Sequence, residues 1–123
     1  MIHDQNQSEY FQHERLDAYR HALEAVQLVA DRRGRLRGLP GNAGPQLERA
    51  VVGAITNLCS AVVGEGAERQ RCLRIALAEA SESGAASDVA LVFGGLSEGE
   101  HARLRQTLLR LCSCLRGLLR TPR

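Results

Sequence analysis

The chain has 123 residues, of which 44% are hydrophobic and only 3% aromatic, with no tryptophan. A domain of this length buries about two-thirds of the surface that its unfolded chain exposes. Because leucine, valine and alanine must then supply the core, closely packed helices are favoured over a β-sandwich. No run of about 18 uncharged apolar residues occurs, which excludes a membrane-spanning helix.

The formal net charge of +2 conceals a strong segregation of charge, and all 16 cationic residues are arginine. Residues 1–31 carry a net charge of −4, and residues 32–37 add +4. Residues 79–100 carry −5, whereas residues 101–123 hold six arginines and no acid, for +6. Such runs usually form a solvated helix face. Guanidinium groups are also planar forks suited to phosphate or carboxylate contacts.

The first ten residues, MIHDQNQSEY, are polar and predict a disordered N-terminal tail over 1–10, without the apolar core of a signal peptide. We therefore expect a soluble, cytoplasmic protein that makes no membrane contact. In that compartment the four cysteines are expected to be reduced, buried thiols rather than a disulfide framework: Cys59, Cys72, Cys112 and Cys114.

The first helix is predicted from about Phe11 to Arg33, because apolar residues recur there at helical spacing: Leu16, Tyr19, Leu23, Val26 and Ala30. The stretch RRGRLRGLPGNAGP follows, and its glycines and prolines predict a loop. Pro45 is well placed to begin the next helix.

The second helix carries a wide apolar face formed by Leu47, Ala50, Val51, Ala54, Ile55, Leu58, Ala61 and Val62. This face is broader than a surface helix needs, so the helix is expected to be buried on more than one side. Gly64 and Gly66 interrupt the pattern. A third helix is predicted over about 67–93, with core positions Leu73, Ala76, Ala80 and Val89.

A fourth helix begins after Ser97 and Glu100, which fit the S-x-x-E capping box. Its core stripe consists of Leu104, Leu108, Leu111, Leu115 and Leu118. Four helices with short connections predict an all-α fold, an antiparallel up-down-up-down four-helix bundle over residues 11–120. Residues 121–123 are then a short C-terminal tail.

Four stretches carry a family resemblance: QLERA (46–50), Asn57, RIALAEASE (74–82) and DVALVFGGLSE (88–98). Together they resemble the bacterial four-helix-bundle family that includes proteins encoded in intervening sequences of 23S ribosomal RNA genes. That family is related to the accessory variability proteins of diversity-generating retroelements. The likeness covers roughly residues 14–119. In the central motif only Asn57 holds cleanly, and Ser60 stands where the family has a glutamate.

The resemblance implies a bundle that assembles as a ring, often a pentamer. It also implies binding of nucleic acid, RNA or DNA, through a basic surface, in one branch together with a reverse transcriptase. Most members have no established activity. We therefore expect a non-catalytic homo-oligomer, with nucleic acid as its partner and a reverse transcriptase or another protein as a further one.

The candidate nucleic-acid-binding residues are arginines of the glycine-rich connection and of the fourth helix: Arg32, Arg33, Arg35, Arg37, Arg103, Arg105, Arg110, Arg116 and Arg120. Phosphate contacts would make binding strongly salt-dependent. The scarcity of aromatic residues argues against a base-stacking platform. Two alternatives stay open. These arginines could pair with the acids of 79–100 or with a neighbouring chain, or the basic helix could bind a protein partner in an adaptor.

The candidate packing or assembly residues are Gln46, Arg49, Gly53, Asn57, Ser60 and Glu82. On a helical wheel Asn57 lies about 100° from the centre of the apolar face, beside Gly53 and Ser60. A buried amide left unpaired would cost about 1–3 kcal/mol. We therefore expect the Asn57 side chain to bond a neighbouring helix or subunit rather than a ligand.

Metal and catalytic sites are not expected. Cys112 and Cys114 are two residues apart, so on a helix they point in different directions and cannot share an ion. GEG at 64–66 is too short for a phosphate-binding loop, and no strand precedes it. Glu79 and Glu82 lack the Glu-x-x-His motifs of di-iron bundles. The sequence predicts no cofactor.

Overall fold

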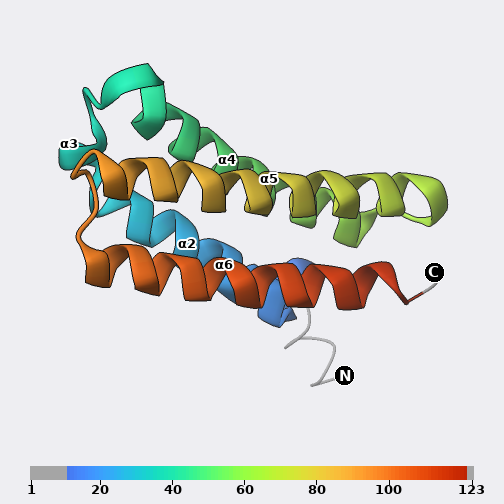
Figure 1. Ribbon diagram of the computed structural model, residues 1–123. Coiled ribbons are helices and arrows are strands. Elements are labelled where there is room, and N and C mark those ends of the chain that lie inside the picture. The colour runs from blue at the N-terminus through green and yellow to red at the C-terminus, as the bar shows by residue number, and fades with distance from the viewer. Residues whose placement is uncertain (1–10, 122–123) are drawn as a thin grey trace.

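The computed structural model describes residues 11–121, and every regular element within that range is helical. In chain order these elements are η1 (Gln12–Arg15), α2 (Asp17–Ala30), α3 (Arg33–Leu36), η2 (Pro40–Asn42), α4 (Ala43–Val63), α5 (Gly66–Val92) and α6 (Glu98–Leu119). The helices α2, α4, α5 and α6 form a bundle, and the others are short turns at its ends (Figure 1). The all-α prediction is confirmed. The predicted N-terminal tail over 1–10 lies outside the described residues.

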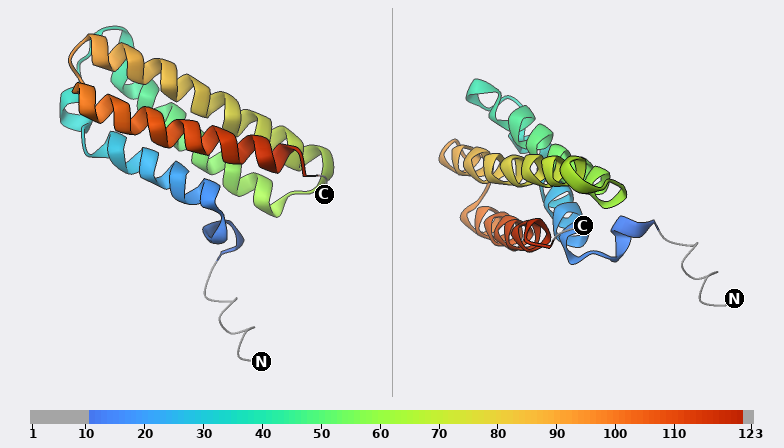
Figure 2. Two further views of the ribbon diagram at one scale, coloured as in Figure 1. Left: turned by 60° about the horizontal axis from the view of Figure 1, so that its bottom comes forward. Right: turned by 90° about the vertical axis from the view of Figure 1, so that its right-hand side faces the viewer.

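Successive long helices run in opposite directions, as the colour gradient in Figure 1 shows. Both α2 and α5 pack against α4 and against α6. Consequently α2 and α5 lie diagonally across the bundle, as do α4 and α6 (Figure 2). This is the up-down-up-down arrangement that four helices with short connections predict.

The connection between α2 and α4 is more ordered than predicted. Instead of a loop it contains α3 and η2, and α4 begins at Ala43, two residues before Pro45. The buried Leu36 holds α3 against the bundle. Two glycines of this connection lie where the chain reverses: Gly38 and Gly41 have φ values of 82° and 66°, which side chains other than glycine rarely adopt.

Gly44 brings the start of α4 into direct contact with the α3 backbone. A Cβ at this position would lie 2.2 Å from the carbonyl oxygen of Leu36 and 2.8 Å from its carbonyl carbon. Only glycine therefore allows this approach, which packs the short connection onto the bundle.

The buried face of α2 is not the predicted stripe of large residues. The buried positions are Ala18, Ala22, Ala25 and Val29, whereas Leu23 is 36% exposed and Ala30 is exposed. Leu16, Tyr19 and Val26 pack at the edge of the core. Alanine faces let helix backbones approach closely, so the larger residues are displaced to the flanks of the helix.

Short side chains also line the inner face of α5, where Ala76, Ala80, Ser83, Ser87 and Ala90 are buried. Both serine hydroxyls donate to carbonyls of the preceding turn, Ser83 to Glu79 and Ser87 to Gly84, each at 2.8 Å. These bonds satisfy the buried hydroxyls. The predicted core position Val89 was wrong: its side chain is 42% exposed, and its neighbour Ala90 is buried instead.

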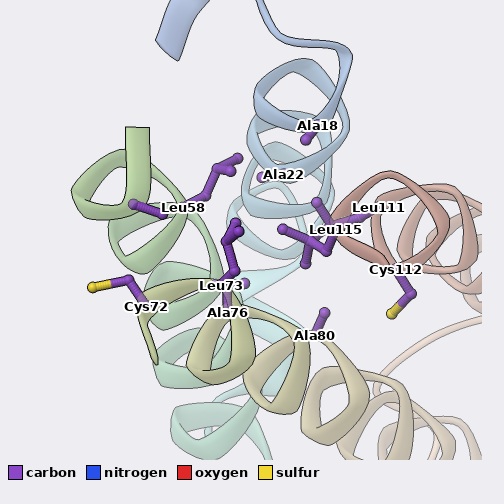
Figure 3. Close-up of a cluster of buried hydrophobic side chains, with 12 residues drawn as sticks. Ala18, Ala22, Leu58, Cys72, Leu73, Ala76, Ala80, Leu111, Cys112 and Leu115 are labelled. Carbon is purple, nitrogen blue, oxygen red and sulfur yellow. The ribbon is translucent and has the colours of Figure 1, made fainter. Parts of the chain in front are cut away.

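The core divides into two clusters along the bundle. Figure 3 shows the cluster beside the α4–α5 turn, where Leu58, Leu73, Leu111 and Leu115 meet the alanines of α2 and α5. The second cluster includes Leu36, Leu47, Val51, Leu104 and Leu108. The wide apolar face predicted for α4 serves both clusters, with Ile55 and Val62 only partly buried.

The predicted capping box begins α6. The Glu100 backbone N–H donates to Ser97 Oγ at 3.1 Å, and the Ser97 backbone N–H donates to Glu100 Oε1 at 2.8 Å. Four of the five predicted core leucines are buried, and Leu118 is half-buried. None of the helices within residues 11–121 has the length and apolar character that a membrane crossing requires.

Candidate nucleic-acid interface

The leucine stripe of α6 turns toward the core, so the arginines on its flanks face outward. Arg103, Arg105, Arg110, Arg116 and Arg120 are all exposed. Arg103 is drawn toward α2, where its guanidinium lies 3.5 Å from the Glu24 carboxylate. The other four have no ion-pair partner among residues 11–121. These four cations are therefore available to an external anion.

The arginines of the α2–α4 connection are mostly engaged within the chain. Arg32 and Arg35 both pair with the carboxylate of Glu100, Arg35 at 2.5 Å. Arg33 pairs with Glu48 at 3.0 Å. Arg37 is exposed and has no ion pair in the described part of the chain. For this group the structure favours the alternative in which arginines pair with the chain's own acids.

Glu100 is the centre of that network. The pKa of the Glu100 carboxyl is lowered to about 2, chiefly by the backbone N–H of Ser97 and also by Arg35 and Arg32, against a raising by burial. One carboxylate thus joins the α3 connection to the first turn of α6. This contact gives Arg32 and Arg35 a structural role and reduces their availability for phosphate.

The two arginine groups do not form one surface. The segment between α2 and α4 (residues 31–42), called here the α3 connection, lies at the end of the bundle where α6 begins. Arg116 lies in the last turn of α6 and Arg120 directly follows that helix, at the opposite end of the bundle (Figure 1). From Arg103 to Arg120 the helix rises about 25 Å. The structure therefore separates predicted site residues that the sequence treats as one basic set.

Arg74 of α5 joins the α6 arginines, although the sequence prediction omitted it. In the antiparallel α5–α6 pair, Asp88 contacts His101 at 2.7 Å and Arg69 reaches the carbonyl of Leu118. This register places the exposed Arg74 at the level of the α6 turn that carries Arg116. We call Arg74, Arg105, Arg116 and Arg120 the α5–α6 basic face. The antiparallel order of the third and fourth predicted helices is a signal that could have revealed Arg74.

Two acidic side chains of α5 near this face have partners. Asp88, which is 59% exposed, contacts His101 at 2.7 Å, and Glu68 pairs with Arg71 at 3.2 Å. The exposed residues that follow Arg74 on α5 are Ala78, Ser81 and Ala85, together with Glu82, which lies on the α4 side of the helix. Beyond Arg74, small side chains therefore line most of the α5 side of the face.

Arg69, by contrast, is only 5% exposed and cannot serve this face. Its guanidinium donates to the carbonyl oxygens of Thr121 at 3.2 Å and Leu118 at 3.4 Å. A cation at these carbonyls also complements the helix dipole. Arg69 thus caps the C-terminal end of α6.

The candidate packing residues gather along the joint between α4 and α5. Gln46, Arg49, Glu79 and Glu82 line a groove there of about 390 Å³. The Glu79 side chain lies directly over Gly53. A Cβ added to Gly53 would be 2.2 Å from a carboxylate oxygen of Glu79. Burial raises the pKa of the Glu79 carboxyl, and the neighbouring Glu82 raises it further, against a lowering by Arg49.

Asn57 and Ser60 lie along the same side of α4, Asn57 half-buried and Ser60 exposed. The Asn57 amide donates to the carbonyl oxygen of Gly53 at 2.9 Å, which is a bond within its own helix. Within the described chain this amide therefore bonds its own helix, and the expected contact of Asn57 with a neighbouring helix or subunit stays a prediction.

The cysteines are free thiols, with Cys72 and Cys112 buried and Cys59 and Cys114 half-buried. Burial raises the pKa of all four thiols, so they remain protonated. No group of three potential metal ligands comes together within residues 11–121.

These features define a class of protein: an all-α, antiparallel four-helix bundle with exposed arginines on its last helix. No protein-family model matches the chain, and no curated protein does. Its fold is similar to that of a crystal structure of a protein of unknown function from the S23 ribosomal protein family of Bacteroides thetaiotaomicron. The TM-score is 0.76, with 16% sequence identity, over 85% of this chain and 99% of that one. The resemblance drawn from the sequence is thus confirmed for the fold.

Proposed function

We propose that this chain is a non-catalytic member of the S23 intervening-sequence family that binds nucleic acid through the α5–α6 basic face. The observation that carries the proposal is the set of exposed arginines on α6 that have no acidic partner in residues 11–121. Phosphate is the abundant anion that such a row of guanidinium forks suits. In this proposal Arg32, Arg33 and Arg35 stabilise the fold through their ion pairs and contribute little to nucleic-acid binding.

Gel shifts with generic RNA and DNA at about 50 mM salt test the proposal, because phosphate contacts are strongest at low salt. We expect a complex whose affinity falls steeply as salt increases. Absence of a complex with both RNA and DNA at that salt concentration would overturn the proposal.

A protein partner is the second candidate, and Leu109 is the observation that favours it. This leucine is 55% exposed on α6 among the arginines. An apolar side chain makes no favourable contact with a phosphate group. An adaptor that docks α6 on a partner, such as a reverse transcriptase, would bury Leu109. Leu109→Gln separates the two functions: it should leave nucleic-acid affinity within about twofold, whereas a protein interface would lose an apolar anchor.

We also propose that the chain assembles as a ring, with five copies favoured by the family resemblance. The α4–α5 groove supports this, because it combines the candidate packing residues with the exposed Val89. A ring would repeat the basic face around an axis, and several weak contacts could then act together. Light scattering that shows a monomer at micromolar concentration would remove the assembly proposal.

A further inference from the structure

The arginines of the α5–α6 basic face stand on a regular helical backbone, and their spacing restricts the nucleic acid that the face can bind. Arg105 and Arg116 stand eleven residues apart on one continuous helix, which is about 16 Å, and Arg120 lies about 6 Å further along. The adjoining core side of this helix is anchored by Leu108, Leu111 and Leu115, which are at most 3% exposed. The backbone positions that carry the arginines are therefore held at a fixed spacing.

This spacing suits phosphates on two strands. The major groove of B-form DNA is about 12 Å wide, so phosphates on its two edges lie within reach of side chains about 16 Å apart. By the α5–α6 register, Arg74 lies near the level of Arg116 and Arg120 at one end of the face, and Arg105 lies about three turns away toward the other. A regular duplex presents its phosphates without further ordering. A flexible strand would lose conformational entropy to match the same array.

The face also lacks what single-stranded binding needs. Proteins that bind single strands stack bases on aromatic side chains, at about 1–3 kcal/mol per base. The aromatic residues within 11–121 lie on other segments than α6 and the Arg74 part of α5: Tyr19 is on α2, Phe11 precedes η1, and Phe93 follows the last residue of α5. The α5 side of the face instead carries small exposed side chains, which leave room for a double helix to approach: Ala78, Ser81 and Ala85.

We propose that the α5–α6 basic face binds the sugar–phosphate backbone of an intact double helix and does not open it. This inference rests on the proposed function, since it concerns the same face. It adds the form of the ligand, and it adds Arg74 as a contact. The spacing argument applies to the groove of B-form DNA. Duplex RNA supplies the same paired phosphate backbone but has a narrower major groove, and the two are compared in the test.

The test is fluorescence anisotropy on the full chain at about 50 mM salt, with 20-base-pair DNA, 20-base-pair RNA and each separated strand. We expect at least one duplex to bind about tenfold or more tightly than either of its strands. The DNA and RNA arms show which duplex is preferred. Equal or tighter binding of the single strands would overturn the inference while leaving the proposed function intact, whereas no binding in any arm would overturn both.

Two further readouts keep the outcome specific. A base analogue whose fluorescence rises on unstacking, placed at the duplex centre, should stay unchanged on binding; a rise would show opening and contradict the inference. Arg74→Gln should lower the slope of log affinity against log salt by about 0.9 for duplex DNA. Arg71→Gln is the matched control, because Arg71 already pairs with Glu68. Equal effects of the two variants would remove Arg74 from the face.

Discussion

At the scale of single residues, this bundle depends on small side chains. Alanines form most of the buried face of α2, and serines take two core positions on α5. The sequence pattern led to a different expectation for α2 because leucine, tyrosine and valine also recur there at helical spacing. Periodicity identifies a helix reliably. Periodicity could not show whether the alanine stripe of α2 or the neighbouring stripe of larger side chains faces the core. That choice depends on how closely the backbones of the neighbouring helices approach α2.

We expect substitution by alanine to change the free energy of unfolding in opposite directions at Gly44 and at Gly84. Gly44→Ala forces a methyl group into the α3 backbone and should lower the free energy of unfolding by about 1–3 kcal/mol. Gly84→Ala meets nothing within 4 Å in the middle of α5 and should raise it by about 0.5–1 kcal/mol. Urea denaturation of both variants measures the difference. Equal effects would contradict the close contact between α3 and α4.

Arg69 is predicted to act on stability and not on binding. Arg69→Met keeps the aliphatic packing but removes two hydrogen bonds to the end of α6, so unfolding should become easier by about 1–2 kcal/mol. Thermal unfolding checks this, with Arg71→Met as the control because Arg71 is exposed. A larger loss from the Arg71 variant would count against the capping role.

At the scale of elements, the sequence predicted the four long helices and the capping box of α6, because each signal is local. The helical turn of the α3 connection was not predicted from the sequence, which indicated a loop, because this turn depends on the burial of Leu36 against helices distant in the sequence. The same limit applied to the candidate site. The sequence could identify every arginine of α6. It could not show that Arg32 and Arg35 meet Glu100, which lies 68 and 65 residues further along the chain.

Glu100 predicts a pH dependence of stability. Its pKa is about 2 in the folded chain, against an ordinary value of 4.5. The ionised carboxylate therefore stabilises the fold fully above pH 4.5, and this contribution is lost as the pH falls toward 2. Glu100→Gln should lower the melting temperature at pH 7, and the gap to the wild type should close between pH 4.5 and 2. A gap that is constant across this range would contradict the network.

At the scale of the whole molecule, the bundle segregates its charged groups. One end joins α3 to α6 through ion pairs, and the α5–α6 basic face extends to the other end. A ring would present this face several times, so assembly and binding should be coupled. Arg74, Arg105, Arg116 and Arg120 lie along one side of the bundle with no acidic partner among residues 11–121, whereas Arg37, Arg49 and Arg110 are exposed without an ion pair elsewhere. We therefore expect binding to depend on where the cations lie as well as on how many there are.

The salt dependence of nucleic-acid affinity tests that claim most directly, using two triple variants with equal loss of charge. The first replaces Arg105, Arg116 and Arg120 by Gln. The second replaces Arg20, Arg33 and Arg71, each exposed and already paired with an acid of the chain. We predict that the first lowers the slope of log affinity against log salt for duplex DNA by about 2.7, and that the second changes it by less than about 0.9. An equal reduction in both would show that net charge alone governs binding and would contradict the assignment of the α5–α6 basic face.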